Sequence, residues 1–450
     1  MKRKPVINTH CHFFNLNFIP CEMVELLGHI TKDMAKDDLF ELGARVFFEI
    51  TPGYGFKRAN KFLKTFKLPI KRVVKEYIKS MDEAGIDICV PLLIDFEKAI
   101  PAVNHKDTVI PYYSEIEESQ ISLISKQIAR YPWRIFPFVM FDPRRENSLE
   151  ICKKAIEEYG YIGIKMYPAL GYHPCPDITR SPGSYWKRFL PYTDEIALRL
   201  EEFYEYCGTN EIPITTHVDI EGAFRSEKLE KNSWLVNSLI KIMELNKIKE
   251  EEVFPFTEMF NWIMPIRKYN LKINFAHLGG NYFHNNKILQ NKALKWREQI
   301  LNLIIFSKEL NKNFGRVYSD LSFHYMALME NTQSAYFKDL RDILQQDSYK
   351  SRILFGTDAS LLSHTWKEKN YIAPFLNEDN LSAEMQSLIL SENPVKFLFK
   401  DARIPDSYVR FLKNNAKPEA LIDLPPWIIK KGDEFFIATG EEYPLLSNKV

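Results

Sequence analysis

The sequence has no excess of one charge, no long apolar run and no secretory signal, and each absence excludes a class of protein. Lys and Arg number 60 against 59 Asp and Glu, so no overall field draws the chain to nucleic acid or to an anionic membrane. No stretch approaches the roughly 20 consecutive apolar residues of a membrane-spanning helix. The basic start leads into an apolar run that breaks at Asn8, too early for a signal peptide. We therefore expect a cytoplasmic protein with neither nucleic acid nor membrane as a partner.

Two further motifs of known chemistry are missing. The 6 cysteines are scattered without a C-x-x-C pair, which fits reduced thiols in a cytosolic protein rather than a disulfide framework. No G-x-G-x-x-G follows the first predicted strand, and its absence removes the usual signal of dinucleotide binding. The whole chain has 450 residues, of which 45% are hydrophobic and 26% charged. This is an ordinary globular composition, and the chain is long enough for a large core.

Short apolar runs alternate with longer segments of helical periodicity. Eight strands are predicted, the first beginning with Pro5 to Ile7 and the others over 88–94, 135–141, 162–166, 212–216, 272–276, 317–321 and 352–355. Gly85, Gly160 and Gly208 are expected to end three of the helices between them. This alternation predicts the α/β class, as a (β/α)8 TIM barrel with rim insertions and a C-terminal extension, rather than an open doubly wound sheet.

The connections between the predicted elements are uneven in length. We expect the barrel over residues 1–402, with insertions at about 13–70 and 219–267, and a C-terminal extension over 403–450 that packs on the barrel. Long segments that follow barrel strands build the rim of the pocket. We interpret both insertions as lids or subunit contacts. Together with the proline-rich tail, they are compatible with a homodimer.

An H-x-H pattern, His10 and His12, ends the first predicted strand. Alternate residues on a strand project from the same face, so the two imidazoles are able to share one ion such as Zn²⁺ or Fe²⁺. Two structural or exposed histidines would give the same pattern, and the other strand ends must decide. His217 and His277 each directly follow a later predicted strand, and Asp358 follows the last one after Gly356 and Thr357. The carboxyl ends of barrel strands converge on one mouth. A metal site at that mouth explains the set better than chance does.

The same strand ends carry motifs in a characteristic order. T-H-C-H, T-T-H, N-F-A-H-L-G-G and F-G-T-D stand at the first, fifth, sixth and eighth predicted strands, and the segments 139–144, 163–168 and 391–399 add further similarity. Over about residues 5–400 the chain resembles the amidohydrolase superfamily, and specifically its amidohydrolase-2 branch. That branch contains aminocarboxymuconate-semialdehyde decarboxylase and related metal-dependent hydrolases.

The resemblance implies one divalent metal ion, with Zn²⁺ expected and Mn²⁺ or Fe²⁺ as alternatives. By similarity, the ion is held by His10, His12, His217 and Asp358. His277 then stands beside the metal-activated water, where it stabilises developing charge or shuttles a proton. Asp358 touches the metal and takes the proton of the water, so Asp358 and His277 are the expected catalytic residues.

Lys165 has two interpretations. In binuclear members of the superfamily a lysine at the end of the fourth strand is carbamylated and bridges two metals. The sequence around Lys165 resembles the mononuclear branch instead, which favours substrate contact or a structural ion pair. Tyr167 and His173 lie in the following loop and are candidate substrate contacts, against rim packing for Tyr167 and a surface position for His173. Arg144 and Arg145 either receive a carboxylate or hold their loop through a salt bridge.

Other polar residues near strand ends are weaker candidates. They are His284, Ser322, His324 and Ser360, and neither serine has a partner in the sequence that would make it a nucleophile. We expect a metal-dependent hydrolase, in which a metal-activated water attacks an amide, lactone, ester or carbon–carbon bond of a small molecule. Non-oxidative decarboxylation of an aromatic or unsaturated carboxylate at the same site is the alternative, and a cation that holds the carboxylate would be diagnostic for it. A non-catalytic metal- or ligand-binding barrel is the third reading.

Overall fold

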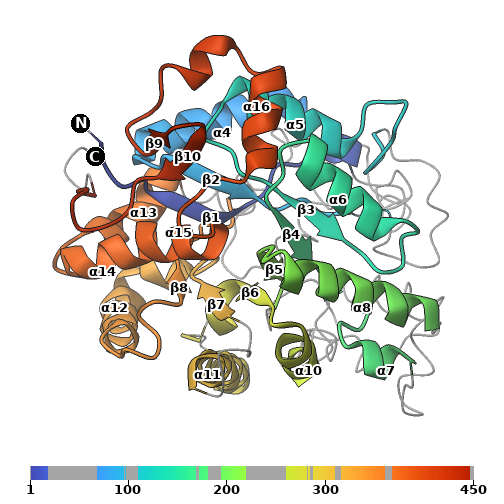
Figure 1. Cartoon of the computed structure of the whole chain (residues 1–450). Coiled ribbons are helices and arrows are strands. Elements are labelled where there is room, and N and C mark those ends of the chain that lie inside the picture. Colours follow the sequence, from blue (N-terminus) through green and yellow to red (C-terminus); the bar gives the residue numbers. More distant parts are fainter. Residues whose placement is uncertain are drawn as a thin grey trace, which may run out of the picture.

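The computed structural model describes residues 2–18, 68–95, 97, 110–168, 172–180, 194–218, 260–280, 282–283, 287–309, 316–359 and 367–445. In these residues, strands and helices alternate along the chain around a central barrel (Figure 1). Most of the expected insertions at 13–70 and 219–267 falls outside them, and so do His284, Ser360 and the last five residues of the expected extension 403–450.

Parallel strands form the barrel wall. Within the described ranges there are eight: β1 (Ile7–Cys11), β2 (Ile88–Pro91), β3 (Phe138–Phe141), β4 (Gly163–Met166), β5 (Ile214–Thr216), β6 (Lys272–Phe275), β7 (Arg316–Asp320) and β8 (Ile353–Leu354). β3 to β8 pair in succession, and β1 pairs with β2. Backbone bridges from Leu92 to Phe138 and from Cys11 to Ala359 join the two sheets at both seams. The strands therefore follow one another around a ring, and the predicted (β/α)8 class is confirmed.

The strand bounds differ from the expected ones at the prolines. Pro91, Pro137 and Pro213 each stand at a point where the structure ends or begins a strand inside the predicted range. Proline has no backbone N–H, so it cannot donate to the ladder at that position. β1 begins at Ile7 rather than at Pro5 and runs into the histidine motif as far as Cys11, so the motif ends the first strand as predicted.

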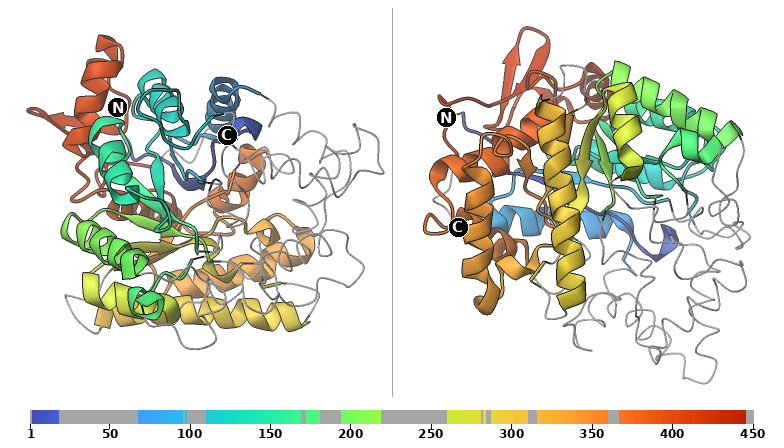
Figure 2. Two further views of the ribbon diagram at one scale, coloured as in Figure 1. Left: turned by 90° about the vertical axis from the view of Figure 1, so that its right-hand side faces the viewer. Right: turned by 90° about the horizontal axis from the view of Figure 1, so that it is seen from below.

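Helices cover the outside of the barrel, as the views from the side and from below show (Figure 2). Those of the barrel repeats are α4 (Ile70–Ala84), α5 (Gln120–Arg130), α6 (Ser148–Glu158), α7 (Pro176–Arg180), α8 (Asp194–Thr209), α10 (Phe260–Tyr269), α11 (Lys287–Glu309) and α12 (Glu330–Leu344). In α4 the buried residues include Val73, Tyr77 and Met81, whose spacing of four places them on the core-facing stripe. In the described part of the chain, no helix has both the length and the apolar character needed to cross a bilayer.

The glycines predicted to end helices divide into two kinds. Gly85 caps α4 with a left-handed φ of 69°, and Gly160 follows α6 with a φ of 79°, so both act as predicted. Gly208 does not, because α8 continues through it to Thr209. A Cβ at Gly208 would collide with the carbonyl oxygen of Tyr269, so this glycine serves the close approach of α8 to the end of α10.

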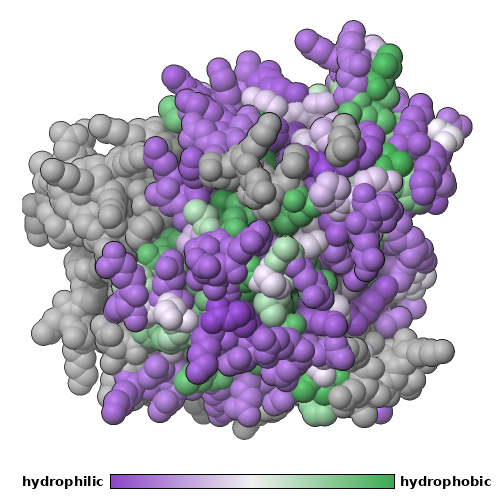
Figure 3. Space-filling view, turned by 90° about the vertical axis from the view of Figure 1, so that its left-hand side faces the viewer, coloured by the Kyte–Doolittle hydropathy of each residue, from purple (hydrophilic) through white to green (hydrophobic). Residues whose placement is uncertain are grey.

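The described part of the chain after β8 contains four α-helices, the short helical turns η9 (Leu388–Glu392) and η10 (Pro418–Leu421), and a hairpin. The α-helices and strands are α13 (Glu368–Leu376), α14 (Ala383–Ser387), α15 (Asn393–Leu398), α16 (Asp406–Asn415), β9 (Ile428–Lys431) and β10 (Glu434–Ile437). Tyr408 of α16 stacks on Phe136 at 4.4 Å, and Phe435 of β10 stacks on Trp133 at 5.0 Å, so the segment adheres to the chain that leads into β3. Among the described residues of the face in Figure 3, hydrophilic side chains predominate and hydrophobic ones stand in smaller groups between them.

Candidate metal centre

The histidine pair of β1 and the aspartate after β8 meet at the barrel mouth. The Nε2 atoms of His10 and His12 lie 3.3 Å apart. Asp358 Oδ1 lies 3.2 Å from Nε2 of His12 and 3.7 Å from Nε2 of His10. All three side chains are buried, and one donor atom from each lies within 4.8 Å of the others. Two imidazoles and a carboxylate in such a group have the chemistry of a metal site.

The backbone around Asp358 is shaped to bring it against β1. Asp358 has a left-handed φ of 54°, which is strained for a residue with a Cβ, and its N–H donates to the carbonyl of His10 at 2.9 Å. Two residues earlier, a Cβ on Gly356 would lie 2.8 Å from the Cβ of His10. The glycine of the F-G-T-D motif therefore lets the β8 end approach the histidine motif closely.

The tautomers of His10 and His12 follow from their outer partners. His12 Nδ1 lies 2.8 Å from the carbonyl oxygen of Leu92, which only accepts, so this nitrogen carries the proton. His10 Nδ1 lies 3.1 Å from Oδ2 of Asp320 and donates to that carboxylate. Both Nε2 atoms are then unprotonated, and both face Asp358. Metal-ligating histidines are oriented by outer partners of this kind.

The electrostatics keep this group free of protons. Burial lowers the pKa values of His10 and His12, so both rings stay neutral although carboxylates are near. Burial alone would raise the pKa of Asp358, but His12 and His10 lower it to about 2. Two lone pairs and a negative oxygen thus converge in a buried place, where such groups repel one another unless a cation lies between them. The donor set fits a divalent metal ion.

His277 and His217 extend the group on its other side. His277 follows β6 in the turn η7 (Ala276–Gly279) with a left-handed φ of 68°. Its Nδ1 faces the carbonyl oxygen of Ser322 at 3.3 Å, so Nδ1 carries the proton and Nε2 is an acceptor. That Nε2 lies 3.3 Å from Nδ1 of His217. Nε2 of His217 is buried without a hydrogen-bond partner among the described residues, and His217 stands outside the three-residue group of His10, His12 and Asp358.

Asp320, at the end of β7, is part of the site although no motif pointed to it. Its Oδ2 accepts from His10 at 3.1 Å and from Nδ2 of Asn274 at 2.6 Å. Its Oδ1 accepts from the backbone N–H groups of His277 at 3.2 Å and Ser322 at 3.0 Å, and from the Ser322 hydroxyl. Burial alone would raise the pKa of Asp320, but His10 holds it well below its usual range. The period of two along β7, which turns alternate residues inward, was the available signal.

Lys165 lies in the same region as an uncompensated cation. It is fully buried on β4, and its Nζ has no hydrogen-bond partner in the described part of the chain. Burial lowers its pKa to about 8, against the opposing influence of Asp320 and Asp358. Nζ stands 5.2 Å from the ring centre of Tyr167, whose ring stacks on that of His217 at 4.3 Å. Tyr167 therefore touches the histidine group and is more than rim packing, and the ion pair considered for Lys165 is absent from these residues.

The remaining candidates from the sequence are His173, Arg144 and Arg145. His173 is buried rather than on the surface, accepts at Nδ1 from the N–H of Cys175 at 3.1 Å, and has its pKa lowered to about 4 by burial. Arg144 pairs with Asp142 at 2.6 Å. Its neighbour Arg145 pairs with Asp95 at 2.6 Å, so both arginines form the loop-holding salt bridges.

His324 supports the site from behind. Its Nε2–H donates to the carbonyl of His277 at 2.7 Å, and the hydroxyl of Tyr336 donates to its Nδ1 at 3.1 Å. Burial lowers the pKa of His324 to about 4, so the ring is neutral. This contact braces the turn whose left-handed backbone carries His277. Ser322 was a weak candidate for a nucleophile. In the structure its hydroxyl lies between two histidines, 3.0 Å from Nδ1 of His10 and 2.9 Å from Nδ1 of His277.

A known protein family matches most of the sequence. The model of the amidohydrolase family matches residues 7–400. No curated relative matches the sequence. Among solved structures, 5-carboxyvanillate decarboxylase of Novosphingobium aromaticivorans, in complex with manganese and 4-hydroxy-3-methoxy-5-nitrobenzoic acid, is 13% identical, with 88% of this chain and 96% of that chain covered and a TM-score of 0.47.

Two further solved structures are similar to this chain. 2,6-Dihydroxybenzoate decarboxylase from Rhizobium is 13% identical, covers 88% of this chain and 99% of its own, and has a TM-score of 0.44. A probable 2-pyrone-4,6-dicarboxylic acid hydrolase from Acinetobacter baumannii, with citric acid bound, is 12% identical at 88% and 99% coverage, with a TM-score of 0.41.

Proposed function

Because the chain belongs to the amidohydrolase family, as its sequence motifs predicted, we propose that it is a metal-dependent hydrolase with one divalent ion held by His10, His12, His217 and Asp358. The observation that carries this proposal is the convergence of two unprotonated Nε2 atoms and one carboxylate oxygen within 4.8 Å. His217 is the proposed fourth ligand because its Nε2 is buried without a partner among the described residues. Zn²⁺ is the proposed ion, with Mn²⁺ or Fe²⁺ as alternatives.

Within this proposal, the chain supplies two groups that move protons. A bound divalent ion would supply Lewis acidity and a water activated near neutral pH. Asp358, which His12 and His10 keep ionised, accepts a proton from that water. His277 offers an unprotonated Nε2 because Ser322 fixes the proton on Nδ1. As a neutral ring, His277 gives the leaving group a proton only after its Nε2 has taken up the one that Asp358 removes from the water.

Substrate binding is proposed at Lys165 and Tyr167. The buried ammonium of Lys165 lacks a hydrogen-bonding partner in the described residues, so an anionic part of the substrate would complete it. The ring of Tyr167 stacks on His217 and offers an apolar wall beside the same place. His173 stays a predicted substrate contact. The substrate is thus a small molecule that carries a carboxylate near an amide, lactone, ester or carbon–carbon bond.

Decarboxylation of an aromatic or unsaturated carboxylate is the second candidate, and one specific observation favours it. The cation expected to be diagnostic for a bound carboxylate is present as Lys165, buried within the influence of Asp320 and Asp358. The reaction would use the same ligands. A non-catalytic barrel is the remaining alternative, and cytoplasmic location and a homodimer stay predictions from the sequence.

Metal analysis and two substrate panels test the proposal. We expect purified protein to hold about one divalent ion per chain, and His12→Ala and Asp358→Ala to lose it. A panel of esters, lactones and amides measures hydrolysis, and carbon dioxide release from hydroxybenzoates measures decarboxylation. Full metal retention by both variants would overturn the ligand set, and metal binding without turnover in either panel would favour the non-catalytic barrel.

A further inference from the structure

A second cavity lies at the opposite end of the barrel from the metal centre. Its volume is about 760 Å³, within the range of small-molecule sites. Three of its lining residues mark the starts of strands, since Ile162 precedes β4, Pro213 precedes β5 and Lys272 begins β6. The histidines and Asp358 stand at strand ends instead. The cavity is therefore separate from the candidate metal centre.

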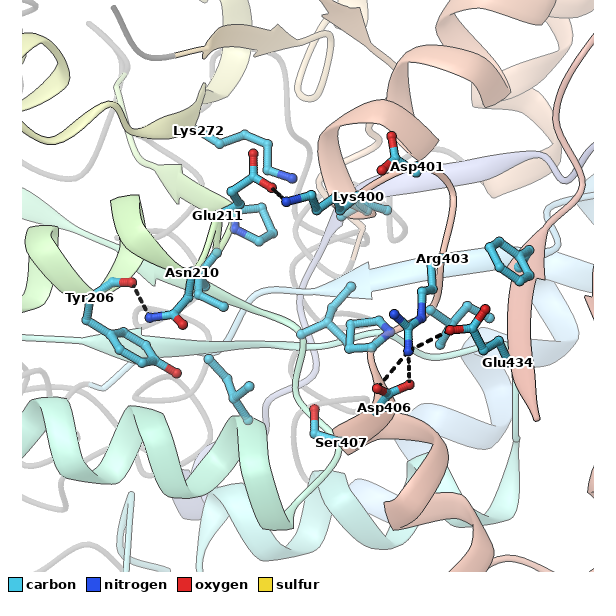
Figure 4. A pocket seen from close by; sticks show the side chains of 18 residues that line it. Tyr206, Asn210, Glu211, Lys272, Lys400, Asp401, Arg403, Asp406, Ser407 and Glu434 are labelled. Atoms are coloured by element: carbon cyan, nitrogen blue, oxygen red, sulfur yellow. Dashed lines mark hydrogen bonds and ion pairs between the residues drawn. The ribbon is translucent and has the colours of Figure 1, made fainter. Parts of the chain in front are cut away.

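The C-terminal segment closes this cavity on its other side. Asp406 and Ser407 come from the start of α16, and Glu434 comes from β10 (Figure 4). The lining also includes apolar residues, among them Ile212 and Leu398. A ligand here would touch the barrel and the C-terminal segment at once. An apolar lining with a few placed polar groups is typical of sites for small organic molecules.

Most of the charged side chains that line the cavity form ion pairs. On one side Arg403 pairs with Asp406 at 2.8 Å and with Glu434 at 3.0 Å. On the other, Glu211 pairs with Lys400 at 2.7 Å (Figure 4). Glu211 also pairs with Arg316 at 2.5 Å, although Arg316 is not among the residues that line the cavity. These pairs leave out Asp401, which is exposed, and Lys272, which is buried.

Lys272 is a buried cation without a counter-ion of its own. Only 2% of its surface is exposed, and the structure gives its Nζ no hydrogen bond or ion pair within the described residues. Burial lowers its pKa to about 8, and the nearby Arg316 and Lys400 act in the same direction. Glu211, the carboxylate that acts on Lys272 in the opposite direction, is already shared by those two cations. Burying an ammonium without a partner is costly, so its position facing a cavity indicates a missing anion.

We propose that this cavity is a second small-molecule site, which binds an organic carboxylate with an apolar body. The carboxylate pairs with Lys272, and the apolar body lies on Ile212 and Leu398. Such a ligand holds the C-terminal segment to the base of the barrel and stabilises the folded chain by mass action. The site does not depend on the reaction proposed for the metal centre.

The test uses 4-bromobenzoate as the probe and the full chain as it is purified. Bromine is located by its anomalous scattering in crystals soaked with the probe, which separates this cavity from the metal centre. Affinity is measured in solution by calorimetry. We expect a bromine peak in the cavity with the carboxylate toward Lys272, and a rise of the thermal midpoint with probe concentration.

Three variants and a neutral analogue make the test specific. We expect Lys272→Met to lose the cavity peak and about 10-fold or more of the affinity of this site. Lys272→Arg, which keeps the charge, should retain the peak and so show that loss is not a folding defect. Lys154→Met is the matched control, because that lysine is not among the residues that line the cavity and pairs with Glu115 at 2.9 Å. 4-Bromobenzamide, which lacks the negative charge, should not occupy the cavity.

Other outcomes would overturn the proposal. They are a bromine peak only at the metal centre, a cavity filled by a segment of the chain itself, equal binding of the amide, and an unchanged peak and affinity in Lys272→Met.

Discussion

Asp320 accepts a hydrogen bond from Nδ1 of His10 at 3.1 Å, so a carboxylate on β7 sets the tautomer of a candidate metal ligand on β1. The same carboxylate accepts the backbone N–H of His277 and the hydroxyl of Ser322. One buried negative group therefore orients both the candidate ligand His10 and the candidate proton carrier His277. Outer groups of this kind tune metal affinity as strongly as many direct contacts do.

We expect Asp320→Asn to weaken metal binding. Both oxygens of Asp320 accept from donors, so an amide of the same shape must point its NH₂ group at another donor whichever way it lies. His10 then loses the negative charge beside Nδ1 in either orientation, and loses the acceptor as well when the NH₂ group faces it, so metal affinity should fall roughly 10- to 100-fold. Chelator competition followed by mass spectrometry measures it.

Asp339→Asn is the matched control for Asp320. Asp339 also accepts from two side chains, Tyr282 at 2.9 Å and Arg297 at 2.6 Å, but it has no contact with the histidine group. It should change stability only. Equal metal affinity in Asp320→Asn and the wild type would show that the contact with His10 is structural.

We expect Ser322→Ala to slow turnover while the metal stays bound. The hydroxyl lies 2.9 Å from Nδ1 of His277 and 3.0 Å from Nδ1 of His10. After its loss, His10 keeps Asp320, whereas His277 keeps only the longer contact to the Ser322 carbonyl at 3.3 Å. The orientation of His277 should suffer more, so kcat should fall about 10-fold with metal content unchanged.

Ser319→Ala is the control for this prediction, since the Ser319 hydroxyl also lies on β7 and donates to the carbonyl of Phe275 at 2.6 Å. Steady-state kinetics on the best substrate of the two panels, with metal analysis of the same samples, distinguishes the variants. A loss of metal from Ser322→Ala in proportion to activity would contradict the role given to the serine.

Much of the site was predictable because strand geometry dictates it. The alternation of side chains along β1 is enough to place His10 and His12 on one face, and the convergence of strand ends brings Asp358 to them. The barrel order follows from the regular spacing of apolar runs. These features depend on local periodicity, which a single sequence carries.

What could not be predicted depends on contacts between distant positions. Asp320 meets His10 across 310 residues, and nothing local to either side chain announces the pair. The burial of His173 and the need for a glycine at 208 arise from packing against other segments, which periodicity does not report. The left-handed backbone of His277 is held by its neighbours, since a residue with a Cβ does not prefer it.

We expect Glu368→Gln to remove part of the pH dependence of stability. Glu368 is buried on α13 with Thr357 donating to it at 3.2 Å, and burial raises its pKa to about 8. Between pH 4.5 and 8 the folded chain therefore keeps a proton that the unfolded chain releases, and stability falls as the pH rises through that window. Glutamine cannot ionise, so the variant should gain stability relative to the wild type as the pH rises, by at least about 1 kcal/mol at pH 8 relative to pH 5.

Denaturant unfolding at pH 5, 6, 7 and 8 measures this difference, with Glu384→Gln on the exposed face of α14 as the control. The change with pH of the difference in unfolding free energy between variant and wild type is the test. The size of that difference at a single pH is not, because the substitution itself changes one hydrogen bond. A difference between variant and wild type that stays constant over the four pH values would sink the idea that Glu368 is protonated in the folded chain.

Removal of the metal should destabilise the wild type but not a variant that lacks a metal ligand. His10, His12 and Asp358 converge as acceptors with no proton between them, so without an ion they repel in a buried place. An ion bound to the folded chain alone stabilises it by mass action, about 2.7 kcal/mol at 100 times its dissociation constant. A strong chelator should therefore lower the thermal midpoint of the wild type by several degrees. His12→Ala should begin lower and not respond, and re-addition of Zn²⁺ should restore the wild type alone. If the chelator shifts both proteins equally, the ion that stabilises this chain lies elsewhere.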